Sequence, residues 1–130
     1  MDWDHNAYYH RLLLRHLPRP CNRVLDVGCG AGVFAGELAE RAGHVDALDR
    51  SPAMIEEAKR VAPPNVRCIL SDVRQEPLPD AGYDAIVSIS ALHHTPVEAV
   101  LPRLAGALRP GGVLAAAALP RRDLLHELPA

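Results

Sequence analysis

The segment Gly28-Cys29-Gly30-Ala31-Gly32 has the residue types of a loop that holds a ligand. Glycine permits positive φ angles and lets backbone amides approach a bound group closely. The spacing is G-x-G-x-G, which differs from the G-x-G-x-x-G of dinucleotide sites. Asp26 lies just ahead of the loop, where a carboxylate would repel a pyrophosphate. The pattern therefore favours a ligand that carries a cationic ammonium group and no phosphate.

Two further acidic residues follow apolar runs that read as strands. Asp49 ends one run, and an acid at that place can accept hydrogen bonds from both hydroxyls of a ribose. Asp72 follows the next run, where its carboxylate could accept from an adenine amino group while the Val73 amide donates to a ring nitrogen. Asp72 could instead cap a turn, as aspartate often does after a strand.

The scaffold for these residues is predicted from hydrophobic periodicity and from helix stop signals. Helices are expected over residues 4–17, 33–41, 52–61 and 97–108, and strands over residues 23–27, 45–49, 66–70, 83–88 and 113–119. Proline, glycine and aspartate predict a loop over residues 75–82 and a turn over residues 109–112. Alternating strands and helices imply right-handed crossovers. We therefore expect an α/β fold with a Rossmann-like parallel sheet of about five strands, and ligands beyond their carboxyl ends.

The composition is that of an ordinary globular domain. The chain has 130 residues, of which 48% are hydrophobic and 23% charged, with a net charge of -2. This balance predicts no nucleic-acid partner, and no apolar run is long enough to span a membrane. The three cysteines form no C-x-x-C pair, and the seven histidines show no chelating spacing. We expect a soluble, cytoplasmic protein without a metal site, with an N-terminal helix or lid over residues 1–20, a core over residues 21–119 and a tail over residues 120–130, in one domain.

Four stretches of the sequence resemble class I S-adenosylmethionine-dependent methyltransferases. They are VLDVGCGAG, ALDRSPAMIEEAKR, CILSDVRQEPLPDAGYDAIVSISALHH and LRPGGVLAAA. The chain is most similar to the small-molecule branch that includes ubiquinone and menaquinone C-methyltransferases. The resemblance implies in-line transfer of a methyl group to a small-molecule acceptor, with S-adenosylhomocysteine as product. The acceptor atom, whether carbon, oxygen or nitrogen, stays open.

The resemblance also implies roles for individual residues. Those near the methionine part of the cofactor would be Asp26, Gly28, Cys29, Gly30, Gly32, Ser88 and Ile89. Asp49 would hold the ribose, while the adenine would be bordered or read by Arg50, Met54, Asp72 and Val73. Cys29 would then be a small loop residue and not a nucleophile, whereas Met54 could face the core instead. His93 and His94 would line the acceptor pocket, with His94 a candidate base, and Tyr8 and Tyr9 would either pack on the sheet or form a lid.

The C-terminal part departs from the family pattern. The family normally adds a helix and two strands after the fifth strand, whereas this sequence stops at Ala130. The strand over residues 113–119 would then be an apolar sheet edge, which favours association. A truncated chain, a homodimer through this edge, or a tail folded over it would each fit. Three functions stay open: an active methyltransferase, a cofactor-binding module without turnover, and a dinucleotide-dependent oxidoreductase, which the glycine spacing, Asp26 and Asp72 disfavour.

Overall fold

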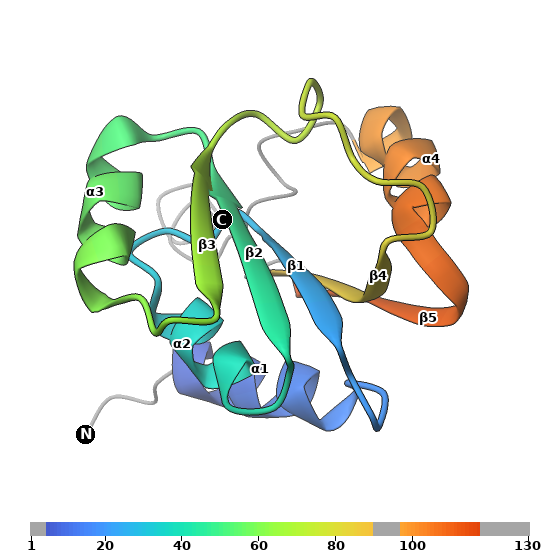
Figure 1. Ribbon diagram of the computed structural model, residues 1–130, viewed down its shortest axis with the longest axis horizontal. Coiled ribbons are helices and arrows are strands. Elements are labelled where there is room, and N and C mark those ends of the chain that lie inside the picture. Colours follow the sequence, from blue (N-terminus) through green and yellow to red (C-terminus); the bar gives the residue numbers. More distant parts are fainter. Residues whose placement is uncertain (1–4, 90–96, 118–130) are drawn as a thin grey trace, which may run out of the picture.

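Helices and strands alternate along most of the chain, and an irregular segment joins the third strand to the fourth (Figure 1). The computed structural model describes residues 5–89 and 97–117. The helices in these ranges are α1 (His5–Arg15), α2 (Val33–Ala39), α3 (Pro52–Val61) and α4 (Val97–Ala107). The strands are β1 (Arg23–Val27), β2 (His44–Asp49), β3 (Val66–Leu70), β4 (Tyr83–Ile89) and β5 (Leu108–Ala117).

The five strands form one parallel sheet in the order β3-β2-β1-β4-β5. The central strand β1 pairs Val27 with Leu48 of β2 on one side and with Ser88 of β4 on the other. The predicted Rossmann-like α/β fold is confirmed by this topology. Within the described ranges β5 pairs only with β4, so it lies at an edge of the sheet, as expected.

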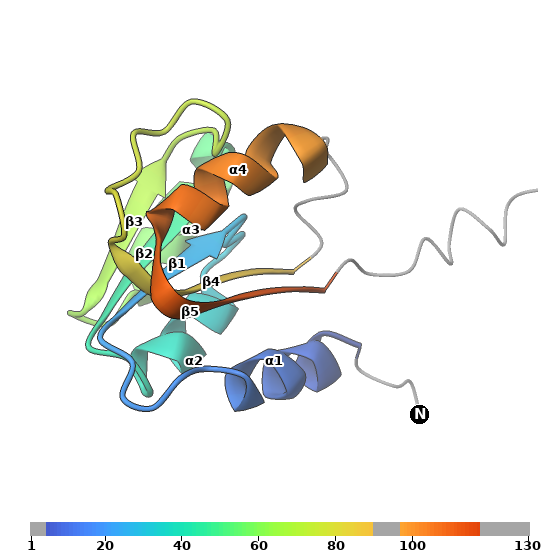
Figure 2. The same ribbon diagram turned by 90° about the vertical axis from the view of Figure 1, so that its right-hand side faces the viewer.

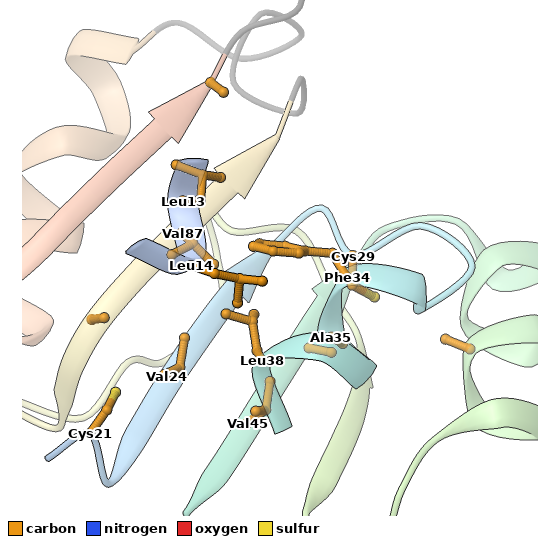
Figure 3. Packing of buried hydrophobic residues seen from close by; sticks show 14 of the residues in the cluster. Leu13, Leu14, Cys21, Val24, Cys29, Phe34, Ala35, Leu38, Val45 and Val87 are labelled. Atoms are coloured by element: carbon orange, nitrogen blue, oxygen red, sulfur yellow. The ribbon is translucent and has the colours of Figure 1, made fainter. Parts of the chain in front are cut away.

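The two faces of the sheet are covered by different helices. Residues from α1, α2 and α3 pack with one set of strand side chains, among them Val24, Val45 and Val87 (Figure 3). The other face is covered by α4, which lies across the sheet from α1 and α2 in Figure 2. Leu25 and Ile86 on that face pack with Leu104 of α4, and all three are fully buried. This layering leaves the strand ends to carry the polar residues.

The predicted turn over residues 109–112 is wrong, because β5 already begins at Leu108. The strand register shifts between Tyr83 and Ala85, and Gly111 adopts a φ of 80°. The guanidinium of Arg109 also pairs with Asp84 of β4, with Nη1 3.2 Å from Oδ1. The glycines are therefore accommodated within β5 at the point where its pairing register with β4 shifts. Residues 118–119 of the predicted strand, and the tail, lie outside the described residues.

A buried polar cluster joins the amino-terminal ends of three strands. Asp46 of β2 accepts hydrogen bonds from Arg23 Nη2 at 2.9 Å and from the Tyr83 hydroxyl at 2.6 Å, and His44 Nε2 lies 2.7 Å from its Oδ1 atom. Asp46 is 1% exposed, yet both of its oxygens are hydrogen-bonded. The cluster links the strands at the end of the sheet opposite the glycine loop.

No helix in the described ranges is both long and apolar enough to cross a membrane.

Candidate functional site

The glycine loop lies between β1 and α2, at the carboxyl end of the central strand. Gly28, Gly30 and Gly32 have φ angles of 78°, 55° and 92°, which side chains disfavour. At Gly32 a Cβ atom would also lie 3.0 Å from the Cα atom of Ala58 in α3. The amides of Gly28 and Cys29 both donate to the Leu48 carbonyl, at 2.7 and 2.8 Å. The loop is therefore bound to the end of β2 through its backbone.

Asp49 joins this loop to the start of α3. Its Oδ2 atom accepts from the Gly30 amide at 2.9 Å, and its Oδ1 atom accepts from the Ser51 amide at 2.9 Å. Each carboxylate oxygen has two lone pairs, so both oxygens can still accept from a ligand. Ser51 in turn caps α3, because its hydroxyl accepts from the Met54 amide at 3.3 Å. The predicted ribose acceptor is thus a fixed group between the loop and a helix start.

Asp26 is buried within the same edge of the sheet. It is 2% exposed, and its Oδ2 atom has no hydrogen-bond partner among the described residues. Burial, together with the nearby charge of Asp49, raises the pKa of Asp26 from 3.8 to about 7. A buried carboxylate oxygen without a donor is costly unless a cation or a donor meets it. Asp26 is therefore an acceptor that the described residues leave unsatisfied.

Cys29 is a buried thiol and not an activated one. Burial and the charges of Asp26 and Asp49 raise its pKa to about 12, so it stays protonated at neutral pH. A nucleophilic cysteine needs the opposite, a lowered pKa. The geometry therefore agrees with its expected part as a small loop residue.

The segment after β3 lies beside Asp49, because the Ser71 amide donates to the Asp49 carbonyl at 3.0 Å. Asp72 is held by Arg74, whose amide and guanidinium both donate to its carboxylate. These hydrogen bonds lower the pKa of Asp72 to about 2. The Arg74 amide bond is the turn-capping role that the sequence left open. Val73 is buried, and Arg103 of α4 donates to its carbonyl.

Arg74 and Arg103 were not foreseen from the sequence. Their hydrogen-bond partners include backbone atoms and a neighbouring side chain, and such contacts leave no characteristic residue spacing in a sequence. The only sign for Arg103 was its place beside Leu104, a core position of an amphipathic helix.

The other predicted residues are spread around this edge. Arg50 is exposed, and the Ser88 hydroxyl donates to the Val27 carbonyl at 2.9 Å, while Ile89 is half-buried at the end of β4. Met54 is exposed, so the expectation that it could face the core is wrong. Ile55 and Ala58, three residues apart, occupy the buried face of α3 instead.

The N-terminal helix packs on the sheet through Leu13 and Leu14. Tyr9 packs against the same core, whereas Tyr8 is 40% exposed and meets Tyr9 edge to face, with ring centroids 5.3 Å apart. Packing is thus observed for Tyr9, and a lid stays a prediction. His93 and His94 lie outside the described residues. Within those residues, no group of three or more metal-ligating side chains comes together.

Comparison with known proteins gives a consistent picture. Residues 24–112 match the sequence model of a family described as a methyltransferase domain. The chain is 41% identical over 115 residues to an uncharacterized methyltransferase of Mycobacterium tuberculosis, covering 87% of this chain and 58% of that protein. It is 38% identical over 113 residues to the ubiquinone biosynthesis O-methyltransferase of Methylocella silvestris, covering 82% and 44%. The chain thus spans about half the length of the curated relatives it matches.

Solved structures share the fold. An S-adenosylmethionine dependent methyltransferase from Mesorhizobium loti superimposes with a TM-score of 0.71 at 31% identity, covering 78% of this chain and 49% of that one. The N-methyltransferase NodS from Bradyrhizobium japonicum, solved with S-adenosylhomocysteine, gives 0.72 at 24% identity, covering 83% and 59%, a likeness of fold alone. These matches confirm the resemblance that the sequence motifs indicated.

Proposed function

The chain belongs to the S-adenosylmethionine-dependent methyltransferase family, and from this premise we propose that it binds S-adenosylmethionine at the carboxyl edge of its sheet and passes the methyl group to a small-molecule acceptor. S-adenosylhomocysteine is the expected product. The acceptor atom, carbon, oxygen or nitrogen, is left open.

The unsatisfied carboxylate of Asp26 is the observation that carries this proposal. Its buried Oδ2 atom, in the strand that leads into the glycine loop, has no donor among the described residues. The amino group of a methionine moiety would bring both a positive charge and N–H donors to this oxygen. A pyrophosphate would bring negative charge instead. Asp26 therefore supports S-adenosylmethionine over a dinucleotide.

The proposed roles are those that the resemblance to the family implies for the residues at this edge. The methionine part would lie against Asp26, the loop residues Gly28, Cys29, Gly30 and Gly32, and the ends of β4 at Ser88 and Ile89. Asp49 would accept from the ribose hydroxyls. Arg50 and the exposed Met54 would border the adenine, and Asp72 and Val73 would read its edge. Because the Gly30 amide bonds Asp49, the methionine and ribose subsites are held at a fixed separation.

Methyl transfer asks little covalent chemistry of the protein. When bound, S-adenosylmethionine would supply a methyl group on a sulfonium: an electron pair of the acceptor would form the new bond to the methyl carbon, and the sulfur would leave with the electrons of the broken bond. The chain must hold the acceptor, the methyl carbon and the sulfur in line and exclude water. The hydrogen-bonded glycine loop and Asp49 would hold the cofactor in this alignment. The candidate base His94 lies outside the described residues, and its role stays a prediction.

The proposal is tested by calorimetric titration of the whole chain with S-adenosylmethionine, S-adenosylhomocysteine and NAD. We expect micromolar binding of the two adenosyl ligands and none of NAD. Binding of NAD alone would favour the oxidoreductase alternative. A folded sample that binds none of the three would refute the proposal.

Asp49 gives a sharper test of the ribose subsite. Asp49→Ala should weaken S-adenosylhomocysteine binding by roughly 1–3 kcal/mol, because ribose hydroxyls and the Gly30 amide lose their acceptor. Asp49→Asn keeps one acceptor oxygen and should lose less. Asp80→Ala is the matched control, since Asp80 is an exposed aspartate in the segment between β3 and β4. Unchanged affinity in Asp49→Ala would remove Asp49 from the site.

We also propose that the edge strand β5 supports a homodimer. Its inner neighbour is β4, and within the described ranges no strand pairs with its other side. Val113, Leu114 and Ala115 give this edge little charge, which favours pairing with a second copy. Sedimentation over a concentration series should show association. A monomer that persists at high concentration would refute the dimer and leave cofactor binding untouched.

A further inference from the structure

Arg103 of α4 contacts the backbone of the segment that joins β3 to β4. Its Nη1 atom donates to the Val73 carbonyl, and its Nη2 atom donates to the Glu76 carbonyl at 2.6 Å. Arg103 is half-buried. In Figure 1 this segment crosses from the tip of β3 toward α4 before it enters β4. A second hydrogen bond joins this segment to α4 farther along the chain, where the Ala81 amide donates to the Gly106 carbonyl at 2.9 Å.

The contact with Val73 reaches the carboxylate of Asp72 through one peptide group. The peptide between Val73 and Arg74 is held at both ends. Its carbonyl accepts from Arg103, and its N–H donates to Asp72 Oδ1 at 2.9 Å. The Arg74 guanidinium also donates to both oxygens of the Asp72 carboxylate, so the peptide held by Arg103 is one of two groups that position this carboxylate. The Asp72 carbonyl is also occupied, because it accepts from the Gln75 and Glu76 amides, both at 2.9 Å.

We propose that Arg103 is a positioning residue that sets the preference of the site for adenine. The inference rests on the proposed function, in which Asp72 and Val73 read the adenine edge. An adenine amino group donates to a carboxylate, whereas the carbonyl of hypoxanthine at the same position would face it as a second acceptor. A carboxylate held in one place discriminates between the two bases, and a mobile one turns away from the mismatch.

The alternative is that Arg103 only stabilises the fold. Val73 lies in the apolar cluster with Val100 and Leu104, so loss of the arginine could loosen α4 as a whole. A general loosening would weaken every ligand of the site by the same factor. A positioning role would change the ratio of two affinities that differ only at the base edge. The ratio therefore separates the two explanations.

The experiment is calorimetric titration with S-adenosylhomocysteine and with S-inosylhomocysteine, which replaces the amino group of the base by a carbonyl. Wild-type protein should prefer the adenosyl ligand by at least about tenfold. Arg103→Ala should lower this ratio, mainly through weaker adenosyl binding, although Arg74 still contacts the carboxylate. Arg103→Lys keeps the charge but lacks the forked pair of donors, so its ratio should be intermediate. Arg109→Ala is the control, because the ion pair of Arg109 is with Asp84 of β4.

Each outcome bears on a different claim. A wild-type ratio that persists in Arg103→Ala, with both affinities lowered equally, would overturn the positioning role. A wild-type protein that binds both ligands equally would overturn it too and leave the proposed function standing. A folded wild-type protein that binds neither ligand would overturn the proposed function itself. If Arg103→Ala does not fold, the ratio in Arg103→Lys decides the question.

Discussion

Replacing Asp26 with asparagine should make the ligand-free protein more stable and its cofactor binding weaker. Burial and the charge of Asp49 raise the pKa of Asp26 from 3.8 to about 7. This difference of about three pKa units corresponds to roughly 4 kcal/mol at 1.36 kcal/mol per unit. The ionised carboxylate therefore costs the folded chain a large part of an ordinary domain's stability. Asparagine has nearly the same shape and carries no charge.

The sign of the pH dependence follows from where the proton is held. Between about pH 4 and pH 7 the folded protein keeps a proton on Asp26 that the unfolded chain releases. The contribution of Asp26 is therefore most favourable below the unfolded pKa and is lost as the pH rises through the folded one. The gain in stability from Asp26→Asn should grow by about 1.4 kcal/mol per pH unit across this window and then level off.

Urea unfolding of both proteins between about pH 4.5 and pH 8.5 measures this gain, because the free energy difference cancels the titration of groups that both share. Asp80→Asn is the control, because it makes the same substitution at an exposed aspartate outside the site. A stability difference for Asp26→Asn that is flat with pH would refute the buried charge. So would a variant less stable than wild type at pH 8.

Binding should change in the opposite direction. At about pH 8 Asp26→Asn should weaken S-adenosylhomocysteine binding by roughly tenfold or more, since the ligand ammonium loses a charged acceptor. Near pH 6 the wild-type carboxyl is itself largely protonated, so the difference in affinity between wild type and Asp26→Asn should be smaller. Equal affinities at pH 8 would place the ligand amino group elsewhere.

Three further substitutions test the glycine loop and the opposite end of the sheet. Gly32→Ala should destabilise the fold by about 1–3 kcal/mol in urea unfolding, because of its φ of 92° and a Cβ atom only 3.0 Å from the Cα atom of Ala58. Gly36→Ala, within α2 and with nothing near its Cβ atom, should instead be neutral or stabilising. Asp46→Asn should cost about 3–5 kcal/mol near neutral pH. Burial alone would raise the pKa of Asp46, but hydrogen bonds from Tyr83, His44 and Arg23 lower it. The difference in stability between wild type and Asp46→Asn should therefore shrink as the pH falls below about 4. An unchanged urea midpoint of Asp46→Asn near neutral pH would contradict this prediction.

The elements that the sequence predicts best are those with local start and stop signals. The strands at residues 23–27 and 66–70 were predicted at their observed bounds, because glycines or prolines punctuate short β-branched runs. Helix α3 was also predicted at its observed bounds, since Ser51 caps it and Pro52 is its first residue. The parallel order of the sheet then follows from alternation and crossover handedness.

The errors come from signals that depend on a partner. Residues 109–112 have turn composition, yet they enter β5 because the ladder to β4 tolerates a register shift. Met54 belongs to a residue type that usually fills cores, but the phase of α3 places it outward. In both cases the tertiary context overrides a residue preference, which no single-sequence pattern contains.

The candidate site divides in the same way. The carboxyl ends of parallel strands share one edge, so the neighbourhood of the glycine loop, Asp49 and Asp72 was predictable. The bond between Gly30 and Asp49 and the engagement of Asp72 by Arg74 were not, since loop backbone directions decide them. The reach of Arg103 to the Val73 carbonyl depends on how α4 packs against the segment after β3.

Two buried aspartates of this chain show why burial of charge alone does not mark a functional residue. Asp46 is as deeply buried as Asp26, yet hydrogen bonds to Arg23, His44 and Tyr83 satisfy it, and its pKa is lowered. Within the part of the chain that the structure describes, Asp26 has no such donor at Oδ2, and its pKa is raised. Folding alone explains the first arrangement, because it fastens three strands. It does not explain the second, which lies next to a loop of glycines with positive φ angles and lowers stability at neutral pH. Residues that break the rules of folding without compensation from their surroundings are those for which a ligand is the simplest compensation.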